Sequence, residues 1–568
     1  MDAGMDKAVH GAVPDSRGQN AYLRDPAFAA LMQVYAGEGV RALLDPALHR
    51  MGALVGERLE ELALTADRNP PVLHHRDRTG APDERIEKHP AYQALEQVAF
   101  GDFGLAAMSH RGGVLGAEAP MPPIAKYALV YVLVQAEFGL CCPLSMTDSL
   151  TRTLRKFGAP DLVARHLDAL TSQDMETLCQ GAMFMTEQAA GSDVGATATV
   201  ARREGDGWRL WGDKWFCSNP DAGLAMVLAR PEGDGAGTGG LSLFLLPRHL
   251  PDGSRNAYRI VRLKDKMGTR SMASGEITLE GAEAWLVGEA GQGFRHMTDM
   301  INMSRLANGV RSAGLMRRAV SEALHVARHR QAFGGALIDK PLMQRQLAKM
   351  LVPAEQGRSM VFHTARVLAA ADAGDEAQAR VLRLLTPLIK FRTCRDARAV
   401  AGDAMEVRGG CGYIEEFSDA RVLRDAHLGS IWEGTSNIVA LDVARAARKT
   451  GLTALATYMT ALLKDVEAPL AERLHSALDR AIALMTAVAD GMEHEVRRGA
   501  TALYNAVSAV VMAWEAAQMR ATSPDVARDR VLLTELVLTH RLDALDPLAP
   551  PEKASDLSTL LNRAGRDA

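Results

Sequence analysis

The chain has 568 residues, of which 47% are hydrophobic and 24% are charged, and its formal net charge is −4. This composition is typical of a folded protein of several domains, and the small net charge excludes a global attraction to nucleic acid or to an anionic membrane. Aromatic residues make up only 5%, whereas Ala, Leu and Met are frequent, so we expect helix to dominate.

The N-terminal residues and the cysteines favour a cytoplasmic protein. The chain begins with MDAGMDKAVHGAVPD, which has neither the basic cluster nor the apolar core of a secretory signal. The six cysteines include no CxxC pair, which is typical of reduced thiols, so neither a disulfide framework nor a metal site is expected. The most apolar stretch, residues 500–514, is interrupted by polar residues and predicts a buried amphipathic helix rather than a membrane span.

In chain order, the first segments are helical. Residues 1–40 predict a polar, extended leader, and residues 41–180 predict an N-terminal helical domain. Helical periodicity is clear over residues 91–103 and 124–138, and proline and glycine clusters mark the loops between helices.

Residues 181–290 change to a pattern of strands. ATATVARR and WRLWGDKWF are separated by Gly205-Asp206-Gly207 and predict a hairpin. LAMVLAR, LSLFLLP and EITLEG predict further short strands, so we expect a small antiparallel sheet domain, either a barrel or a sandwich.

Helical spacing returns after residue 290. Residues 291–450 predict a helical bundle domain with long helices over 294–330 and 378–405, and residues 451–568 predict a C-terminal helical extension. Breaks within the extension are expected at three prolines, Pro469, Pro524 and Pro547.

Two motifs carry no function in this context. Residues 235–240 (GAGTGG) satisfy G-x-G-x-x-G, but a dinucleotide fingerprint must open a helix, whereas these glycines run into the predicted strand LSLFLLP. A flexible loop between strands is therefore expected. His74-His75 has no further ligand at a suitable spacing and predicts a solvated loop.

Three stretches from different segments can carry chemistry. Residues 185–193 (MTEQAAGSD) combine hydroxyls with small residues that let a polar ligand approach, although such loops often only turn the chain. Residues 212–219 (GDKWFCSN) offer an aromatic ring and a nearby hydroxyl, with a core aromatic as the alternative. Residues 431–437 (IWEGTSN) place a carboxylate before glycine among apolar residues; either burial makes it a base or it caps a helix.

Together, in this order, the three stretches resemble the acyl-CoA dehydrogenase superfamily. Residues 330–334 (RQAFG) and 406–413 (EVRGGCGY) are similar to two further motifs of that family. The resemblance implies a mainly α fold with a central β domain: an N-terminal helical domain, a small antiparallel β-barrel and a C-terminal four-helix bundle. The extra C-terminal helical domain follows.

The resemblance also implies an FAD site. Thr186 and Met185 are expected to contact the flavin ring, Ser192 to lie near a phosphate, Phe216 to pack on the isoalloxazine and Ser218 to bond near N5. The RQAFG motif implies contact with the FAD of a neighbouring subunit, and the resemblance to a family of tetramers implies a homotetramer. The full set of expected cofactor residues is Met183, Met185, Thr186, Ser192, Phe216, Cys217, Ser218, Arg330, Phe333, Gly410, Ile431, Trp432, Thr435 and Asn437.

Glu433 is the implied base. It is expected to take the α-proton of an acyl-CoA while the β-hydrogen leaves as hydride to flavin N5, and a separate electron acceptor is implied. Some family members carry the base at the position of Ser304, which cannot serve. Arg305 either orients Glu433, holds the acyl pocket or is an ordinary surface arginine.

Local features, among them Pro341 and residues 263–268 (LKDKMG), resemble the adaptive-response, AidB-like branch of the family, which acts in the bacterial response to DNA alkylation. That resemblance implies an alternative function, a flavoprotein associated with duplex DNA and with weak or vestigial dehydrogenase activity. Candidate DNA contacts are Arg445, Arg497 and Arg498. Residues 445–568 carry 15 Lys and Arg against 16 Asp and Glu, which favours a solvated surface or an extension that only builds subunit contacts.

Overall fold

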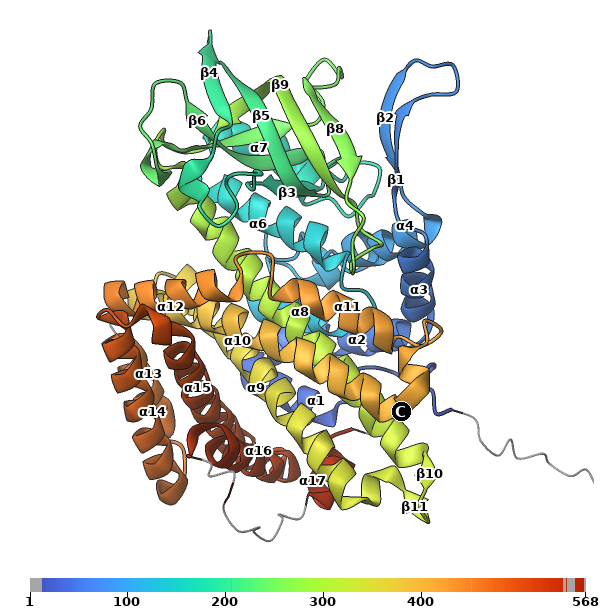
Figure 1. Cartoon of the computed structure of the whole chain (residues 1–568), viewed down its shortest axis with the longest axis vertical. Helices are drawn as coiled ribbons and strands as arrows, with labels where there is room; N and C mark the ends of the chain where they lie inside the picture. The colour runs from blue at the N-terminus through green and yellow to red at the C-terminus, as the bar shows by residue number, and fades with distance from the viewer. Residues whose placement is uncertain (1–12, 206, 451, 545–547, 549–556, 566–568) are drawn as a thin grey trace, which may run out of the picture.

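The structure is a computed structural model that describes residues 13–205, 207–450, 452–544, 548 and 557–565. A β domain lies at one end of a bundle of long helices, and the C-terminal helices lie along the side of that bundle (Figure 1). Within the described residues, no helix is both long enough and apolar enough to cross a membrane.

The N-terminal region is helical with one exception. The sequence predicts an extended leader up to residue 40, but a helix already begins at Pro26, and residues 1–12 lie outside the described part. An antiparallel hairpin of β1 (Val72–Arg76) and β2 (Pro82–Glu87) interrupts the helices. The helices are α1 (Pro26–Tyr35), α2 (Glu38–Leu54), α3 (Glu60–Arg68), α4 (Pro90–Glu96), α5 (Pro123–Leu133), α6 (Cys141–Phe157) and α7 (Pro160–Leu170).

The β domain contains seven strands. They are β3 (Gly181–Phe184), β4 (Val200–Glu204), β5 (Gly207–Ser218), β6 (Leu224–Pro231), β7 (Ser242–Pro247), β8 (Tyr258–Leu263) and β9 (Ser274–Leu286). The pairings run β6–β4–β5–β9–β7 and return to β6, so the sheet closes on itself as a barrel. The predicted hairpin β4–β5 is confirmed, and residues 235–240 form a loop before β7. The expected small antiparallel barrel is confirmed for most pairings, with the correction that β6 pairs in parallel with both β3 and β4.

The bundle is built on the long helices α8 (Gly293–His329), α9 (Pro341–Asp372) and α10 (Glu376–Arg408). The helices predicted over 294–330 and 378–405 are confirmed by α8 and α10. A short hairpin of β10 (Gln331–Ala332) and β11 (Gly335–Ala336) joins α8 to α9. Two further helices, α11 (Asp419–Gly429) and α12 (Ser436–Thr450), pack on α10, and the turn between them carries Glu433.

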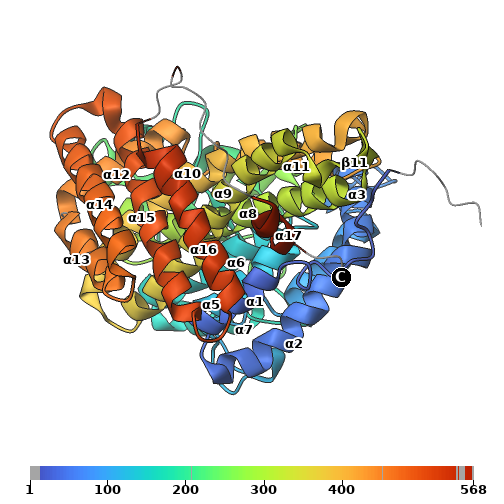
Figure 2. The ribbon, with the colours of Figure 1, turned by 90° about the horizontal axis from the view of Figure 1, so that it is seen from below.

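The C-terminal extension packs on the bundle through α15 and α16 (Figure 2). Its helices are α13 (Leu452–Leu463), α14 (Ala468–Ala489), α15 (Val496–Met519), α16 (Pro524–Val537) and α17 (Ser558–Arg563). Pro469 and Pro524 stand in the first turns of α14 and α16, where a missing N–H is tolerated, while Pro547 lies outside the described residues. The apolar stretch 500–514 lies in α15 and is largely buried.

Buried charges join the extension to the rest of the molecule. Arg530 on α16 is 1% exposed and bonds Glu355 of α9 at 2.7 Å and Glu515 of α15 at 3.0 Å. Glu515 also accepts from the hydroxyls of Tyr35 on α1 and Ser359 on α9, at 2.6 and 2.7 Å. Because unpaired buried charges are costly, these pairs fix the position of the extension.

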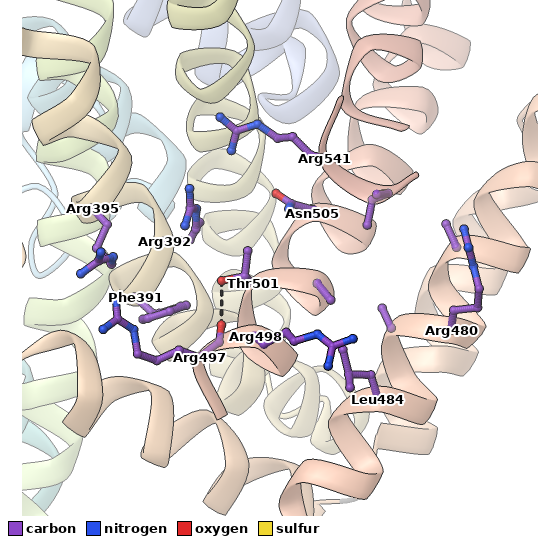
Figure 3. A pocket seen from close by; sticks show the side chains of 14 residues that line it. Phe391, Arg392, Arg395, Arg480, Leu484, Arg497, Arg498, Thr501, Asn505 and Arg541 are labelled. Atoms are coloured by element: carbon purple, nitrogen blue, oxygen red, sulfur yellow. Dashed lines mark hydrogen bonds between the residues drawn. The ribbon is translucent and has the colours of Figure 1, made fainter. Parts of the chain in front are cut away.

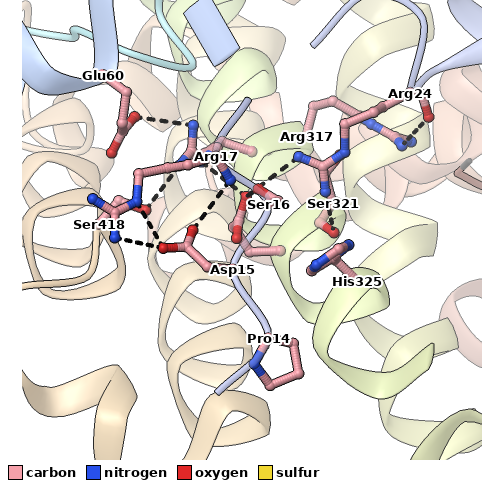
Figure 4. Close-up of polar contacts among 12 residues, drawn as sticks. Pro14, Asp15, Ser16, Arg17, Arg24, Glu60, Arg317, Ser321, His325 and Ser418 are labelled. Atoms are coloured by element: carbon pink, nitrogen blue, oxygen red, sulfur yellow. Dashed lines mark hydrogen bonds and ion pairs between the residues drawn. The ribbon is translucent and has the colours of Figure 1, made fainter. Parts of the chain in front are cut away.

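A second polar network anchors the N-terminal segment on α8 and α10 (Figure 4). Ser16 bonds Glu322, the guanidinium of Arg24 donates to the carbonyl of Ser321 at 3.0 Å, and Arg408 donates to the carbonyl of Pro14 at 2.8 Å. The segment before α1 is therefore held by specific bonds rather than left extended in solvent.

Candidate active site

The turn between α11 and α12 has an unusual backbone. Glu433 has φ 56° and Gly434 has φ 97°, so two successive residues lie in the left-handed region. That region is uncommon for a residue with a side chain, and such outliers concentrate at functional sites. Oε2 of Glu433 is buried and has no hydrogen-bond partner among the described residues. Because buried polar atoms are normally hydrogen-bonded, this unpaired oxygen indicates a place where a ligand can bind.

Two buried cations hold the main chain of this turn. Arg305 on α8 donates through Nε to the carbonyl of Glu433 at 3.2 Å and bonds Asp442 of α12 at 2.6 Å. Lys390 on α10 donates to the carbonyls of Gly429 and Gly434 at 2.7 and 3.1 Å. Burial lowers the pKa of Lys390 to about 8, although Cys394 and the negative charge of Glu433 oppose that shift. Arg305 is only 9% exposed, which excludes an ordinary surface role.

Trp432, the residue directly before Glu433, belongs to a stacked aromatic pair. Trp432 stacks on Phe138, with ring centroids 5.9 Å apart, and the guanidinium of Arg311 lies 4.7 Å from the centroid of the Trp432 ring. The indole Nε1 is also buried without a hydrogen-bond partner among the described residues. The stacked pair and the arginine fix the position of the residue next to Glu433.

Cys142 connects the barrel to this turn. Burial raises the pKa of its thiol, and the charge of Glu433 adds to the rise, whereas a hydrogen bond with Ser218 opposes it. The end of β5 and the α11–α12 turn are therefore close to the same thiol, and the second and third of the candidate stretches meet around it.

Neighbouring residues of β5 in the expected cofactor site lie on opposite faces of the barrel wall. Phe216 is 58% exposed, while Cys217 is fully buried in the barrel core. The side chain of Cys217 therefore faces the barrel core, and only its main chain is available to a cofactor on the outer face. The carbonyl of Thr186 accepts from the N–H of Trp215 at 2.8 Å, so the loop after β3 lies beside Phe216.

Other expected residues lie around this centre. Met183 and Met185 are partly buried against the main core, whereas Ser192, Ile431, Thr435 and Asn437 are exposed. Ser304, at the alternative position of the base, is fully buried, and its hydroxyl has no hydrogen-bond partner among the described residues.

Three expected cofactor residues lie elsewhere in the chain. Arg330 is the residue after the last turn of α8 and comes 25 residues after Arg305. At the rise of an α-helix, this separation corresponds to about 37 Å along the axis. Its Nη1 donates to the carbonyl of Arg408 at 3.0 Å, beside the loop that contains Gly410, and Phe333 is 91% exposed. Within one chain, the RQAFG and EVRGGCGY motifs therefore meet each other and not Glu433.

Two of the three candidate DNA contacts line one pocket, and the third is not among its lining residues. Arg497 and Arg498 line a pocket between α10, α14 and α15, while Arg445 lies on α12, 3.5 Å from Asp442. The extension thus has a local concentration of arginine that its overall charge conceals.

Reasoning from the sequence missed Lys390 and Cys142 as parts of the site. Lys390 interrupts an apolar helical face in the sequence LLTPLIKF, and a lone cation at a core position is the signal that points to it. Cys142 carries no such signal, because a buried cysteine is ordinary in a core.

Comparisons with known proteins agree on one family. Residues 182–282 match the acyl-CoA dehydrogenase middle domain, residues 291–448 match the acyl-CoA dehydrogenase C-terminal domain, and residues 12–177 match the adaptive response protein AidB N-terminal domain. The AidB protein of Escherichia coli K12 is 37% identical over 401 residues, which cover 68% of this chain and 71% of that protein.

Solved structures extend the similarity over the whole fold. The Caenorhabditis elegans protein ACDH-11, solved in complex with C11-CoA, superposes with a TM-score of 0.87 at 27% identity and covers 96% of this chain and 94% of that chain. An acyl-CoA dehydrogenase of Bacillus anthracis, solved with FAD, has a TM-score of 0.67 at 20% identity and shares the fold over 85% of each chain.

Proposed function

Because the chain belongs to the acyl-CoA dehydrogenase family, we propose that it is an FAD-dependent flavoprotein in which Glu433 removes the α-proton of an acyl-CoA. The observation that carries the proposal is the left-handed turn at Glu433, which leaves a buried carboxylate oxygen unpaired. The similarity to ACDH-11, whose structure contains C11-CoA, supports an acyl-CoA as the substrate class.

The residues around Phe216 fit FAD. An exposed ring, the main-chain groups near Thr186 and the hydroxyl of Ser218 together suit a flat, polar-edged ligand. When bound, FAD supplies the acceptor for the hydride that leaves the β-carbon as the α-proton is removed. The position of Cys217 in the core leaves Phe216 and Ser218 as the β5 side chains that contact the cofactor.

The chain's own residues then have separate tasks. Oε2 of Glu433 accepts the α-proton, and the turn that carries it is kept in place by Arg305 and Lys390. Since both cations bond main-chain carbonyls, they fix the geometry of the base and leave its carboxylate available to substrate. Trp432 and Phe138 provide an apolar wall beside the reacting carbon.

The proposal includes a homotetramer in which neighbouring subunits share cofactor sites. Phe333, Leu342 and Tyr413 are 91%, 81% and 82% exposed, and large apolar side chains that are this exposed are typical of surfaces covered by another subunit. Arg330 and Gly410 lie on the same surface, far from Glu433 of their own chain. The proposal therefore assigns them to the FAD of a neighbouring subunit.

The test is anaerobic stopped-flow bleaching of the bound flavin by a panel of straight-chain and branched acyl-CoAs. Wild type is compared with Glu433→Gln and with a control, Glu416→Gln, whose carboxylate is exposed before α11. We expect one acyl-CoA to bleach the flavin rapidly, the control to match wild type, and Glu433→Gln to be slower by about 10³-fold or more. Equal rates in wild type and Glu433→Gln, or flavin that no acyl-CoA reduces, would contradict the proposal.

A further inference from the structure

A pocket in the C-terminal extension is lined by an unusual number of arginines. It has a volume of about 540 Å³ and lies between α10, α14, α15 and the π-helical turn η9 (Leu538–Leu542) (Figure 3). We call it the arginine pocket after its six guanidinium side chains, which are those of Arg392, Arg395, Arg480, Arg497, Arg498 and Arg541.

The positive charge of the arginine pocket is only partly balanced. No acidic side chain is among the residues that line it. Asp396 bonds Arg392 at 2.6 Å and lies 3.6 Å from Arg541, so one carboxylate serves two guanidinium groups. The pairs made by Arg480 and Arg498, with Asp543 at 3.8 Å and Glu495 at 3.3 Å, are long and exposed and therefore weak.

Two of the arginines repel each other across the pocket. Burial lowers the pKa of Arg395, and the positive charge of Arg497 lowers it further, as do those of Arg392 and Arg398. Arg497 has no ion pair within the part of the chain that the structure describes. Positive charges that are held together without a counter-charge favour the binding of an anion.

The size of the arginine pocket restricts which anion it can hold. A volume of 540 Å³ corresponds to a cube with an edge of about 8 Å, which is less than the width of a single major groove of DNA, about 12 Å. It lies within the range of small-molecule sites, about 300–1,000 Å³. A molecule of the size of a nucleotide therefore fits within the pocket.

The chemistry of the walls defines the ligand further. Guanidinium groups bind phosphate oxygens through paired hydrogen bonds, and several of them facing one cavity suit more than one phosphate. Phe391 and Leu484 add an apolar surface between the arginines, as the close-up in Figure 3 shows. We propose that the arginine pocket binds a small molecule with two or more adjacent phosphate groups, of the size of a nucleoside diphosphate.

The test is isothermal titration calorimetry on the FAD-bound full chain after removal of excess FAD, which itself contains two adjacent phosphates, at physiological salt. The probes are ADP and inorganic pyrophosphate, with AMP and inorganic phosphate for comparison. We expect ADP or pyrophosphate to bind at least tenfold more tightly than AMP or phosphate. If ADP alone binds, the apolar wall contributes to recognition, and if both bind, the two phosphates suffice; either result supports the proposal.

The matched variants locate the binding. Arg480→Gln combined with Arg497→Gln removes one guanidinium from each of α14 and α15 and should weaken binding at least tenfold. Arg520→Gln, at the other end of α15 in an exposed pair with Glu467, should leave binding unchanged. Should the double variant not fold, the single variant Arg480→Gln serves, because that side chain is 63% exposed.

Three results would overturn the proposal. The first is no heat of binding for any of the probes, and the second is equal affinity for ADP or pyrophosphate in wild type and the pocket variants. The third is binding of an 18-base-pair duplex that the pocket variants abolish while ADP and pyrophosphate fail to compete. That result would assign these arginines to a nucleic-acid surface instead.

Discussion

Arg305 donates through Nε to the main-chain carbonyl of Glu433 at 3.2 Å and not to its carboxylate. The same guanidinium bonds Asp442 at 2.6 Å, so it joins the turn to α12. Burial favours the neutral form of Asp442, but hydrogen bonds and charge from Arg383 and Arg305 hold its pKa below the usual range. Glu433 is thus positioned through its backbone, and Oε2 of its carboxylate has no hydrogen-bond partner among the described residues.

The variant Arg305→Lys should slow flavin reduction by about tenfold or more, because an ammonium cannot bridge both acceptors as the guanidinium does. As a positioning residue, Arg305 should affect the rate of reduction more than the KM for acyl-CoA. Arg445→Gln is the control, since Arg445 also pairs with Asp442 but is 57% exposed. Stopped-flow reduction measures both, and equal rates for Arg305→Lys and wild type would refute the positioning role.

Phe216→Ala should leave stability nearly unchanged, within about 0.5 kcal/mol, because the side chain is 58% exposed. The affinity for FAD should fall at least tenfold, since the ring is the flat surface proposed to pack on the flavin. Fluorescence titration of apoprotein with FAD measures the change. Val261→Ala on β8, 38% exposed, is the control, and a Phe216→Ala affinity equal to that of the control would remove Phe216 from the site.

Phe333→Asp should dissociate the oligomer and reduce FAD retention together. The side chain is 91% exposed on a strained backbone with φ 54°, and a charge there cannot be buried against another subunit. Sedimentation velocity and the flavin-to-protein absorbance ratio measure the two effects. Met492→Asp, 43% exposed between α14 and α15, should change neither. If wild type is a monomer that holds FAD, the shared site does not exist.

Asp425 should make stability depend on pH near neutrality. Burial raises the pKa of its carboxyl to about 7, against the charge of Arg421. An unfolded aspartate titrates near pH 4, so between about pH 4 and 7 the folded protein binds the extra proton. The contribution of Asp425 is complete below about pH 4 and is lost as the pH rises through 7, by up to about 1.4 kcal/mol per pH unit.

Asp425→Asn tests that dependence. The amide stays neutral and can still accept from the N–H of Thr269, which bonds the carboxyl at 2.6 Å. The stability of the variant relative to wild type should therefore rise between pH 5 and 8 in urea denaturation. The exposed Asp479→Asn is the control. A difference from wild type that does not change with pH would show that Asp425 titrates normally.

Arg530→Met should destabilise the protein by about 3–5 kcal/mol, because Glu355 and Glu515 would be left buried without their shared cation. Arg528→Met, two residues earlier on the same helix but 65% exposed, should stay within about 0.5 kcal/mol of wild type. The change in unfolding free energy of each variant is measured from its denaturation midpoint, with the m-value unchanged. A small loss at Arg530 would mean that the extension is bound by its apolar contacts alone.

Much of the fold could be predicted from the sequence, because long amphipathic helices repeat one signal many times. The helices α8 and α10 were placed within a few residues, and so was the hairpin β4–β5. The direction of strand pairing could not be predicted. The apolar residues of LAMVLAR indicate a buried strand, but they do not indicate which strands pair with β6. The hairpin β1–β2 was missed because VLHHR and PDERIE contribute only one apolar pair to the barrel core, Leu73 with Ile86, which is too few to show an alternating pattern.

The candidates Glu433 and Arg305 came from the resemblance of several motifs in order, because neither residue alone distinguishes a base from a helix cap or a bound arginine from a surface one. The sequence could not show that the carboxylate lacks a partner, because that depends on a left-handed backbone. It also could not show that Cys217 points into the barrel, since a bulge in β5 between Lys214 and Cys217 shifts the alternation of faces. A charge count over residues 445–568 could not show the arginine pocket, because the count averages over many surfaces and omits Arg392 and Arg395 of α10.

The charged contacts of Arg530 with α9 and α15 also constrain how this chain can change over generations. Losing Arg530 first leaves Glu515 buried without its ion-pair partner, so loss of this arginine is a costly first step toward a bundle without the extension. A lineage that acquired the extension and then these pairs would find the route back closed. The C-terminal helices would thus be retained because their loss is destabilising, even in descendants that no longer need the function for which the helices were first selected.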